Sequence, residues 1–220
     1  MRDNDYYRYM LHQKENASIN IDTSNKCILE CPGCQRNDLS NKDKIKNGNI
    51  MPISDFIKIV EYYDNINLCG QISDPVYYRH FNEFLDITKE YPTKTFKIAT
   101  AAHQKNLQWY KNAFNRHNNN VQWIFGLDGL PNTSFLYRIK QNSQLIFDAM
   151  ILGTKLNKKI SWQFIVFDYN KHQIEEAKKI AKENDIRFIL TISDRNRNRS
   201  DSPEEYKEKY KIKNTKRIIT

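Results

Sequence analysis

The chain has 220 residues, with 35 basic and 26 acidic side chains and a formal net charge of +9. This length suits one domain with a core of its own, and no apolar run approaches the roughly 18 residues of a membrane helix. The first residues, Met1 to Asp5, are polar, so no signal peptide is expected. The four cysteines are too few for a disulfide-built fold of this size.

Strand patterns and helix patterns alternate along the chain. Alternating apolar residues or short apolar runs predict strands at residues 18–23, 66–69, 95–100, 121–127, 160–167 and 186–192. Helical spacing of apolar residues predicts a helix after Ser54 as N-cap, then helices at 77–90, 107–115 and 135–152, the last closed by Gly153. A further helix is capped by Asn170, and a short charged helix is expected at 203–211.

Six strand–helix units predict a parallel sheet with right-handed crossovers. Six are too few for a closed eight-stranded barrel, so the α/β fold is either an open partial barrel or a doubly wound sheet. The core is expected over 18–192, between an N-terminal extension at 1–17 and a polar basic tail at 193–220. In both folds, functional residues gather at the carboxyl ends of the strands.

Three cysteines, Cys27, Cys31 and Cys34, follow the first predicted strand within eight residues. Thiolates at such spacing select zinc, copper(I) or an iron–sulfur cluster. Structural zinc usually takes four ligands, and no second Cys-x-x-Cys or His pair lies nearby. A [4Fe–4S] cluster held by three cysteines keeps one iron open for a further ligand. The alternative is a non-catalytic interaction module that binds zinc or an iron–sulfur cluster.

The Cys-x3-Cys-x2-Cys spacing resembles the cluster motif of radical S-adenosylmethionine (radical SAM) enzymes. Residues 69–75 resemble the family loop that binds the amino group of S-adenosylmethionine. Residues 127–130 and Tyr137-Arg138 resemble elements of the branch that includes SPASM and twitch enzymes, and 162–167 resemble its fifth strand. The resemblance covers about residues 18–192. Because no cysteine follows Ile192, we expect the chain to lack the Cys-rich C-terminal domain of that branch.

The resemblance implies an open partial (β/α)6 barrel of the TIM type that binds one [4Fe–4S] cluster through the three cysteines. Its reaction is reductive cleavage of S-adenosylmethionine to a 5′-deoxyadenosyl radical, which abstracts a hydrogen atom from the substrate. The implied partners are an electron donor such as flavodoxin or ferredoxin and a substrate that is a peptide, a nucleotide or RNA, or a small metabolite. Thiolate ligation and oxygen sensitivity predict a cytoplasmic setting without membrane attachment.

The resemblance also implies contacts to S-adenosylmethionine at the strand ends. The residues expected to make them are Gly70, Ser73, Asp74, Thr100, Gly126, Asp128, Arg138, Gln163 and Ile165. Asp74 and its turn would receive the ammonium group, and Arg138 the methionine carboxylate. Gln163 and Ile165 would face the ribose and adenine.

Simpler roles stay open for several of these residues. Asp74 also suits a helix N-cap before Pro75, Arg138 a solvated helix face, and Asp128 a turn before Gly129. Gln163 and Ile165 also suit ordinary strand packing. A degenerate member of the family that binds the cluster without turnover is a third functional possibility.

The basic tail is the other feature that bears on partners. Residues 193–220 carry nine basic and five acidic side chains, which invites an RNA-modifying role. No aromatic RNA-binding signature accompanies them in the sequence.

Overall fold

Six parallel strands form one sheet in a computed structural model that describes residues 17–37, 45, 50–101 and 105–192. Each strand pairs with the next along the chain. The strands are β1 (Ser18–Ile21), β2 (Asn65–Leu68), β3 (Thr95–Thr100), β4 (Val121–Gly126), β5 (Lys159–Ile165) and β6 (Arg187–Thr191). A doubly wound sheet would reverse its strand order. The sequential order is that of a partial barrel, so the predicted fold is confirmed.

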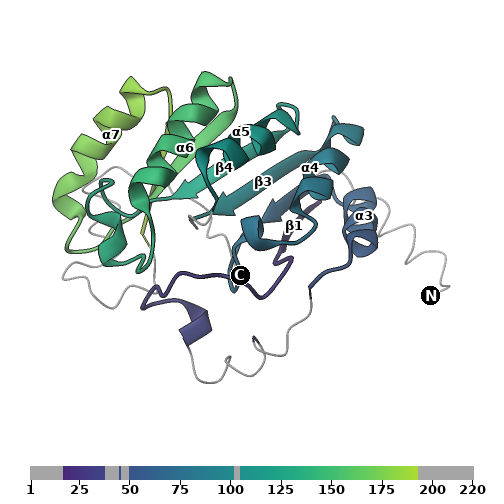
Figure 1. Ribbon diagram of the computed structural model, residues 1–220, viewed down its shortest axis with the longest axis horizontal. Helices are drawn as coiled ribbons and strands as arrows, with labels where there is room; N and C mark the ends of the chain where they lie inside the picture. The colour runs from purple at the N-terminus through teal and green to yellow at the C-terminus, as the bar shows by residue number, and fades with distance from the viewer. Residues whose placement is uncertain (1–16, 38–44, 46–49, 102–104, 193–220) are drawn as a thin grey trace, which may run out of the picture.

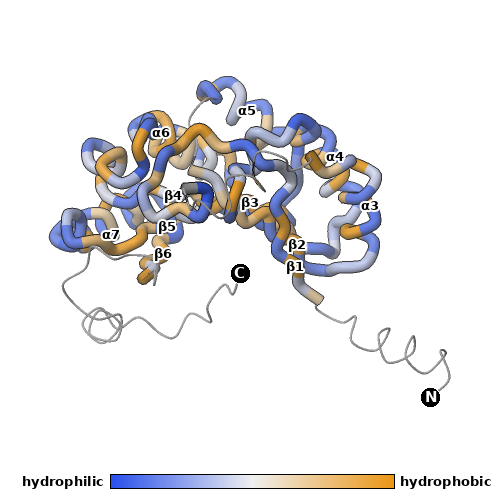
Figure 2. Tube along the Cα trace, turned by 90° about the horizontal axis from the view of Figure 1, so that it is seen from below, coloured by the Kyte–Doolittle hydropathy of each residue, from blue (hydrophilic) through white to orange (hydrophobic). Residues whose placement is uncertain are grey.

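The helices cover the outer face of this sheet, which arches with β1 and β6 at its two open ends (Figures 1 and 2). The α-helices are α3 (Ile53–Tyr62), α4 (Phe81–Glu90), α5 (Leu107–Asn115), α6 (Ser143–Lys155) and α7 (Ile174–Glu183). Short 3-10 turns are η1 (Gln35–Asn37), η2 (Pro75–Tyr77), η3 (Ser134–Leu136) and η4 (Lys171–Gln173). The carboxyl ends of the strands that precede helices therefore all lie at one edge of the arch.

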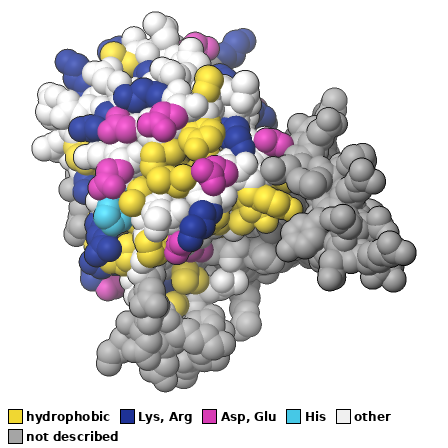
Figure 3. All heavy atoms as spheres, turned by 90° about the vertical axis from the view of Figure 1, so that its right-hand side faces the viewer, with side chains coloured by type: hydrophobic (Ala, Val, Ile, Leu, Met, Phe, Trp, Pro, Cys, Tyr) yellow, Lys and Arg dark blue, Asp and Glu magenta, His cyan; other side chains and the backbone are white. Residues whose placement is uncertain are grey.

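The core lies between the strands and the helices. Along β3, Phe96 and Ile98 are fully buried, whereas Lys97 and Ala99 between them are only half-buried on the inner face. The same alternation in β5 buries Trp162 and Phe164. Successive side chains of a strand point to opposite faces, so the inner face of the arch is the more open one. Outside the core, acidic and basic side chains surround a hydrophobic band on the face shown in Figure 3.

Three helix starts differ from their prediction. The first helix begins at Ile53 behind Pro52, so Ser54 lies inside it and is not its N-cap. The range 77–90 divides into η2 and α4, with the break at Tyr78–His80. Asn170 precedes η4, and its side chain makes no capping bond there. It instead accepts a hydrogen bond from the Phe167 amide at 2.7 Å, which closes a loop.

The predicted helix at 135–152 is wrong in its first third. Residues 137–142 are not helical, and Lys140 has a φ of +71°, which a right-handed helix does not tolerate. Gly153 lies within α6, and the C-cap is Leu156. Its real role is spatial, because a Cβ at Gly153 would lie 2.5 Å from the Cδ1 of Ile160. The glycine lets α6 pack closely on β5.

Several of the sequence predictions concern residues that the structure does not describe. The helix at 203–211, residues 1–16 of the N-terminal extension and the tail at 193–220 lie outside the described residues. Within the described residues, no helix has both the length and the apolar character needed to span a bilayer.

Replacing Gly153 by Val tests the close approach of α6 to β5. The added methyl groups would overpack the contact with Ile160, which typically costs about 1–3 kcal/mol. Chemical denaturation should show that loss in the free energy of unfolding. Val is a better helix former than Gly, so propensity cannot cause the loss at 153, and Lys155→Val, at an exposed position of the same helix, shows the effect of Val without the packing contact. Equal effects of the two substitutions would contradict the packing argument.

The pH dependence of stability should carry a contribution from His117. Burial lowers the pKa of this side chain from 6.5 to about 4, although its hydrogen bond to the Asn118 carbonyl acts the other way. Its Nε2 accepts from the Trp123 indole at 2.9 Å, which requires the neutral ring. Protonation therefore favours the unfolded chain as the pH falls from 6.5 towards 4, by on the order of 3 kcal/mol in total.

Denaturation curves measured across that pH range would reveal this term. In His117→Gln, the amide can still accept from Trp123 but does not titrate. The variant should therefore lose less stability than the native chain between pH 6.5 and 4. Parallel pH profiles for the two proteins would disprove the assignment.

Candidate active site at the carboxyl edge of the sheet

The three clustered cysteines lie between β1 and η1, in a segment that we call the cysteine loop (residues 22–34). All three are half-buried free thiols. The Cys34 amide donates to the Cys31 carbonyl at 3.0 Å, which closes a tight turn. Burial raises the pKa of Cys27 to about 12 and also raises that of Cys31. Both side chains are therefore neutral thiols in the protein without a bound metal.

The donor chemistry of the loop suits a group bound by soft thiolates. The charge of Arg36 acts to lower the pKa of Cys27, and that of Arg138 acts to lower the pKa of Cys31. Both cations thus favour the thiolate form that ligation requires. Over the described ranges of the chain, no three His, Cys, Asp or Glu side chains converge as ligands of one metal ion. Ligation by the three cysteines stays a prediction.

One side of the cysteine loop is tied to the segment after β2. The Nη1 of Arg36 donates to the Asn25 carbonyl at 2.6 Å and also to the carbonyl of Ile72. The Asp74 amide donates to the Lys26 carbonyl at 2.8 Å. The loops that follow the first two strands are therefore joined by hydrogen bonds.

The other side of the cysteine loop contacts the segment after β4, residues 127–142. The Glu30 amide donates to the Ile139 carbonyl at 3.2 Å, and Glu30 forms an ion pair with Lys140. In Figure 1 the purple segment after β1 runs across towards this part of the chain. The loop thus bridges the ends of β2 and β4, which are not neighbours in the sheet.

Asp22 organises the turn at 70–73, and sequence reasoning missed it. Its carboxylate accepts from the Gln71 amide at 3.2 Å, the Ser73 amide at 3.1 Å and the Ser73 hydroxyl at 2.6 Å. Gly70 has a φ of +58°, which favours glycine. The sequence did offer a signal for Asp22, because a polar residue directly after a strand lies at the carboxyl edge of the sheet, where functional residues gather. The predicted residue Ser73 is therefore held by a carboxylate that follows β1, and Gly70 precedes the residues that this carboxylate binds.

Asp74 is buried and already accepts three hydrogen bonds. They come from the Val76 amide at 3.2 Å, the Thr100 hydroxyl at 2.7 Å and the Ala101 amide at 2.8 Å. The first makes Asp74 the N-cap of η2, the structural role that the sequence left open. Thr100 lies on the same face of β3 as the buried Ile98. These bonds hold the Asp74 carboxylate between the turn after β2 and the end of β3.

Asp128 and Arg138 form a buried ion pair at the end of β4. The Nε of Arg138 lies 2.9 Å from the Oδ2 of Asp128, although the two atoms lack aligned hydrogen-bond geometry. The Oδ1 of Asp128 accepts from the Ile165 amide at 2.9 Å. Burial raises the pKa of the Asp128 carboxyl, and the guanidinium opposes that shift. Because arginine does not lose its proton in proteins, the guanidinium stays cationic and favours an ionised partner.

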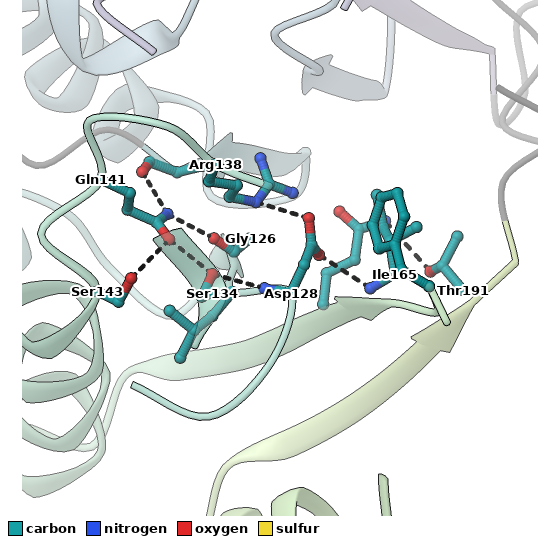
Figure 4. A network of polar contacts seen from close by, with 12 residues as sticks. Gly126, Asp128, Ser134, Arg138, Gln141, Ser143, Ile165 and Thr191 are labelled. Carbon is teal, nitrogen blue, oxygen red and sulfur yellow. Dashed lines mark hydrogen bonds and ion pairs between the residues drawn. The ribbon is translucent and has the colours of Figure 1, made fainter. Parts of the chain in front are cut away.

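Gly126 provides the space that the Arg138 guanidinium occupies. A Cβ at this position would lie 2.7 Å from Nη2 of Arg138. Gln141, which sequence reasoning also missed, donates to the Gly126 carbonyl at 2.9 Å and accepts from the Ser134 hydroxyl at 2.7 Å. Ser134 in turn accepts from the Asp128 amide at 2.9 Å. Figure 4 shows this network, which fixes the non-helical segment that carries Arg138.

The two predicted residues of β5 make different contacts in the candidate site. Gln163 is half-buried on the inner face, and its amide donates to the Thr191 hydroxyl of β6 at 3.3 Å. Ile165 enters the polar network through its backbone, which donates to Asp128 and accepts from the Asn170 side chain at 2.9 Å. Both residues lie at the open side of the sheet, as their alternation predicted. Their contact with the ribose and adenine stays a prediction.

No protein-family model and no curated protein matches this sequence. Solved structures do match. SuiB from Streptococcus suis superposes with a TM-score of 0.69 and 16% identity over 96% of this chain and 53% of its own. SuiB bound to S-adenosylmethionine gives 0.69 and 17% over 96% and 54%. Native anSMEcpe with bound AdoMet (S-adenosylmethionine) gives 0.61 and 18% over 80% and 51%.

These matches establish a shared fold. SuiB and anSMEcpe are radical SAM enzymes, so the architecture that the resemblance implied is confirmed. The chain spans about half the length of the structures it matches. At this level of identity, the activity and ligands of those proteins do not transfer by likeness alone.

Asp22→Asn tests the organisation of the turn at 70–73. The substitution keeps the shape but removes the charge that three backbone amides and a hydroxyl share. Hydrogen bonds to charged groups contribute about 1.5–3 kcal/mol each, so we expect a loss of about 2 kcal/mol in the free energy of unfolding. Asp55→Asn, at an exposed residue of α3, is the matched control. A similar stability for both variants would contradict this role.

Proposed function

We propose that the chain is a radical SAM enzyme that binds one [4Fe–4S] cluster through Cys27, Cys31 and Cys34. The observation that carries the proposal is the contact between the cysteine loop and the segment that carries the charged Arg138. This contact lies at the carboxyl edge of the sheet. The Glu30 amide of the cysteine loop donates to the carbonyl of Ile139, the chain neighbour of Arg138, which supports a position of this ion pair near the proposed ligands. When bound, the reduced cluster would supply the electron that cleaves S-adenosylmethionine to its 5′-deoxyadenosyl radical.

Arg138 is suited to bind the methionine carboxylate. Its Nε faces Asp128, and its two Nη groups donate no hydrogen bond to any of the residues that the structure describes. A guanidinium presents such paired donors to a carboxylate in a fixed plane. Asp128 would hold this fork in place, because it also fixes the β5 backbone.

The segment at 70–74 would receive the ammonium group of the same ligand. Asp74 places a buried negative charge at the end of β3, and Asp22 fixes the turn that precedes it. Gln163 and Ile165, on the inner face of β5, would line the ribose and adenine. These side chains bind and orient the cofactor, while the arch limits the access of water to it.

A peptide is the substrate class that we favour. SuiB has been observed with its precursor peptide SuiA, and anSMEcpe with the Kp18Cys peptide. The proposed reductant is a protein such as flavodoxin or ferredoxin. A reducing cytoplasm is the proposed location, because free thiols and thiolate clusters persist there.

Anaerobic reconstitution with iron and sulfide tests the proposal. The native chain should become brown, hold about four irons and release 5′-deoxyadenosine from S-adenosylmethionine under dithionite. Single replacement of Cys27, Cys31 or Cys34 by Ala should abolish cluster binding. Cys69→Ala is the matched control, because this half-buried thiol lies at the end of β2 outside the cysteine loop.

The alternatives predict different results. A colourless protein that holds one zinc per chain would contradict the proposal and favour an interaction module. A brown protein that binds the cluster but releases no 5′-deoxyadenosine would indicate the degenerate form.

A further inference from the structure

A second concave site lies between the cysteine loop and the amino-terminal ends of α4 and α5. It encloses about 560 Å³, which is within the roughly 300–1,000 Å³ typical of small-molecule pockets. Cys27 lines one wall. Among its described lining residues there is none of the proposed S-adenosylmethionine contacts. The pocket is therefore separate from the strand-end site, although it borders the same loop.

The charge of this pocket has one sign. No carboxylate belongs to the lining residues that the structure describes, whereas four basic side chains do, namely Lys26, Arg36, Arg79 and Lys105. The ion pairs of lysine and arginine found within the described ranges involve other residues, and the remaining pair joins His80 to Glu83 at 3.0 Å. Four cations that form no ion pair with any described carboxylate surround one concavity and concentrate a positive potential there.

Three of these cations are held in place by neutral neighbours. Arg36 donates to two backbone carbonyls, and the Nε of Arg79 donates to the His80 ring at 2.8 Å. The Nζ of Lys105 lies 5.1 Å from the centre of the Trp109 ring. None of these contacts neutralises a charge. The cations are therefore positioned by the protein, and their charge is left for a ligand.

The floor of the pocket is apolar and well packed. Val76, Tyr78 and Phe81 are almost fully buried. The Phe81 ring stacks on Trp109 with centroids 5.5 Å apart, and the Tyr78 hydroxyl donates to the Met51 carbonyl at 2.8 Å. A ligand would therefore meet a preformed surface that accepts an organic body and charged side chains that face its anionic end.

We propose that this pocket binds a phosphorylated small molecule, with its phosphates among the four cations and its organic part against the apolar floor. A single carboxylate would leave most of the positive charge uncompensated, whereas a diphosphate offsets most of it. Arginine forks and lysine ammonium groups are the side chains that recognise phosphate. The proposal does not depend on the cluster, because the four cations and the apolar floor belong to the chain whether or not Cys27 binds iron.

Calorimetric titration of the 220-residue chain with ADP as the probe tests this inference. The titration is run both before and after cluster reconstitution, so its outcome is independent of radical SAM activity. We expect one ADP per chain, weaker binding at high salt, and much weaker binding of adenosine, which lacks the phosphates. Arg79→Glu and Lys105→Glu should each weaken ADP binding at least tenfold. Lys111→Glu, an exposed residue of α5 outside the pocket, should leave it unchanged.

Three results would overturn the proposal. The first is no ADP binding by the native chain, and the second is unchanged binding by both pocket variants while circular dichroism shows them folded. The third is displacement of ADP by S-adenosylmethionine, which would make the pocket part of the strand-end site. Preferential binding of a glutamate-rich peptide over ADP would point to an acidic peptide partner and would also contradict the proposal.

Discussion

The buried ion pair between Asp128 and Arg138 is the contact on which the arrangement of the site depends. Asp128 joins the ends of β4 and β5 through the Ile165 amide and holds Arg138 at the inner edge of the sheet. The segment that carries Arg138 also binds the backbone of the cysteine loop at Ile139. A buried charge without its partner typically costs 3–5 kcal/mol, so Asp128 and Arg138 stabilise the site only together. The three cysteines are thereby placed relative to the strand ends.

Local patterns predicted most of the fold. The strand at 95–100 and the helix at 107–115 match their predicted bounds, because their apolar periodicity is uninterrupted. The long helix at 135–152 was wrong, since its apolar spacing continues through residues whose backbone bends to bind a distant loop. Neither the positive φ of Lys140 nor the contact of Gly153 with Ile160 leaves a local signal. Both follow from tertiary packing.

The candidate site also combines features that local sequence patterns reveal with features that they do not. The cysteine spacing and the strand-end positions were readable, because the side-chain chemistry is concentrated in short motifs. Asp22 and Gln141 were not found, since the amides that Asp22 binds lie 49 to 51 positions away in the chain and the carbonyls that Gln141 binds lie 15 and 40 positions away. Asp74 combines both cases: its capping role was foreseen from Pro75, but its bonds to β3 were not. The basic pocket likewise assembles from three separate loops.

Electron paramagnetic resonance of the reconstituted and reduced protein tests the central claim most directly, because it observes the open iron itself. An iron–sulfur cluster with one iron free of protein ligands should change its spectrum when S-adenosylmethionine is added, and Cys69→Ala should behave like the native chain. A cluster spectrum that is identical with and without S-adenosylmethionine would contradict the account, as would a protein that takes up zinc and gives no such signal.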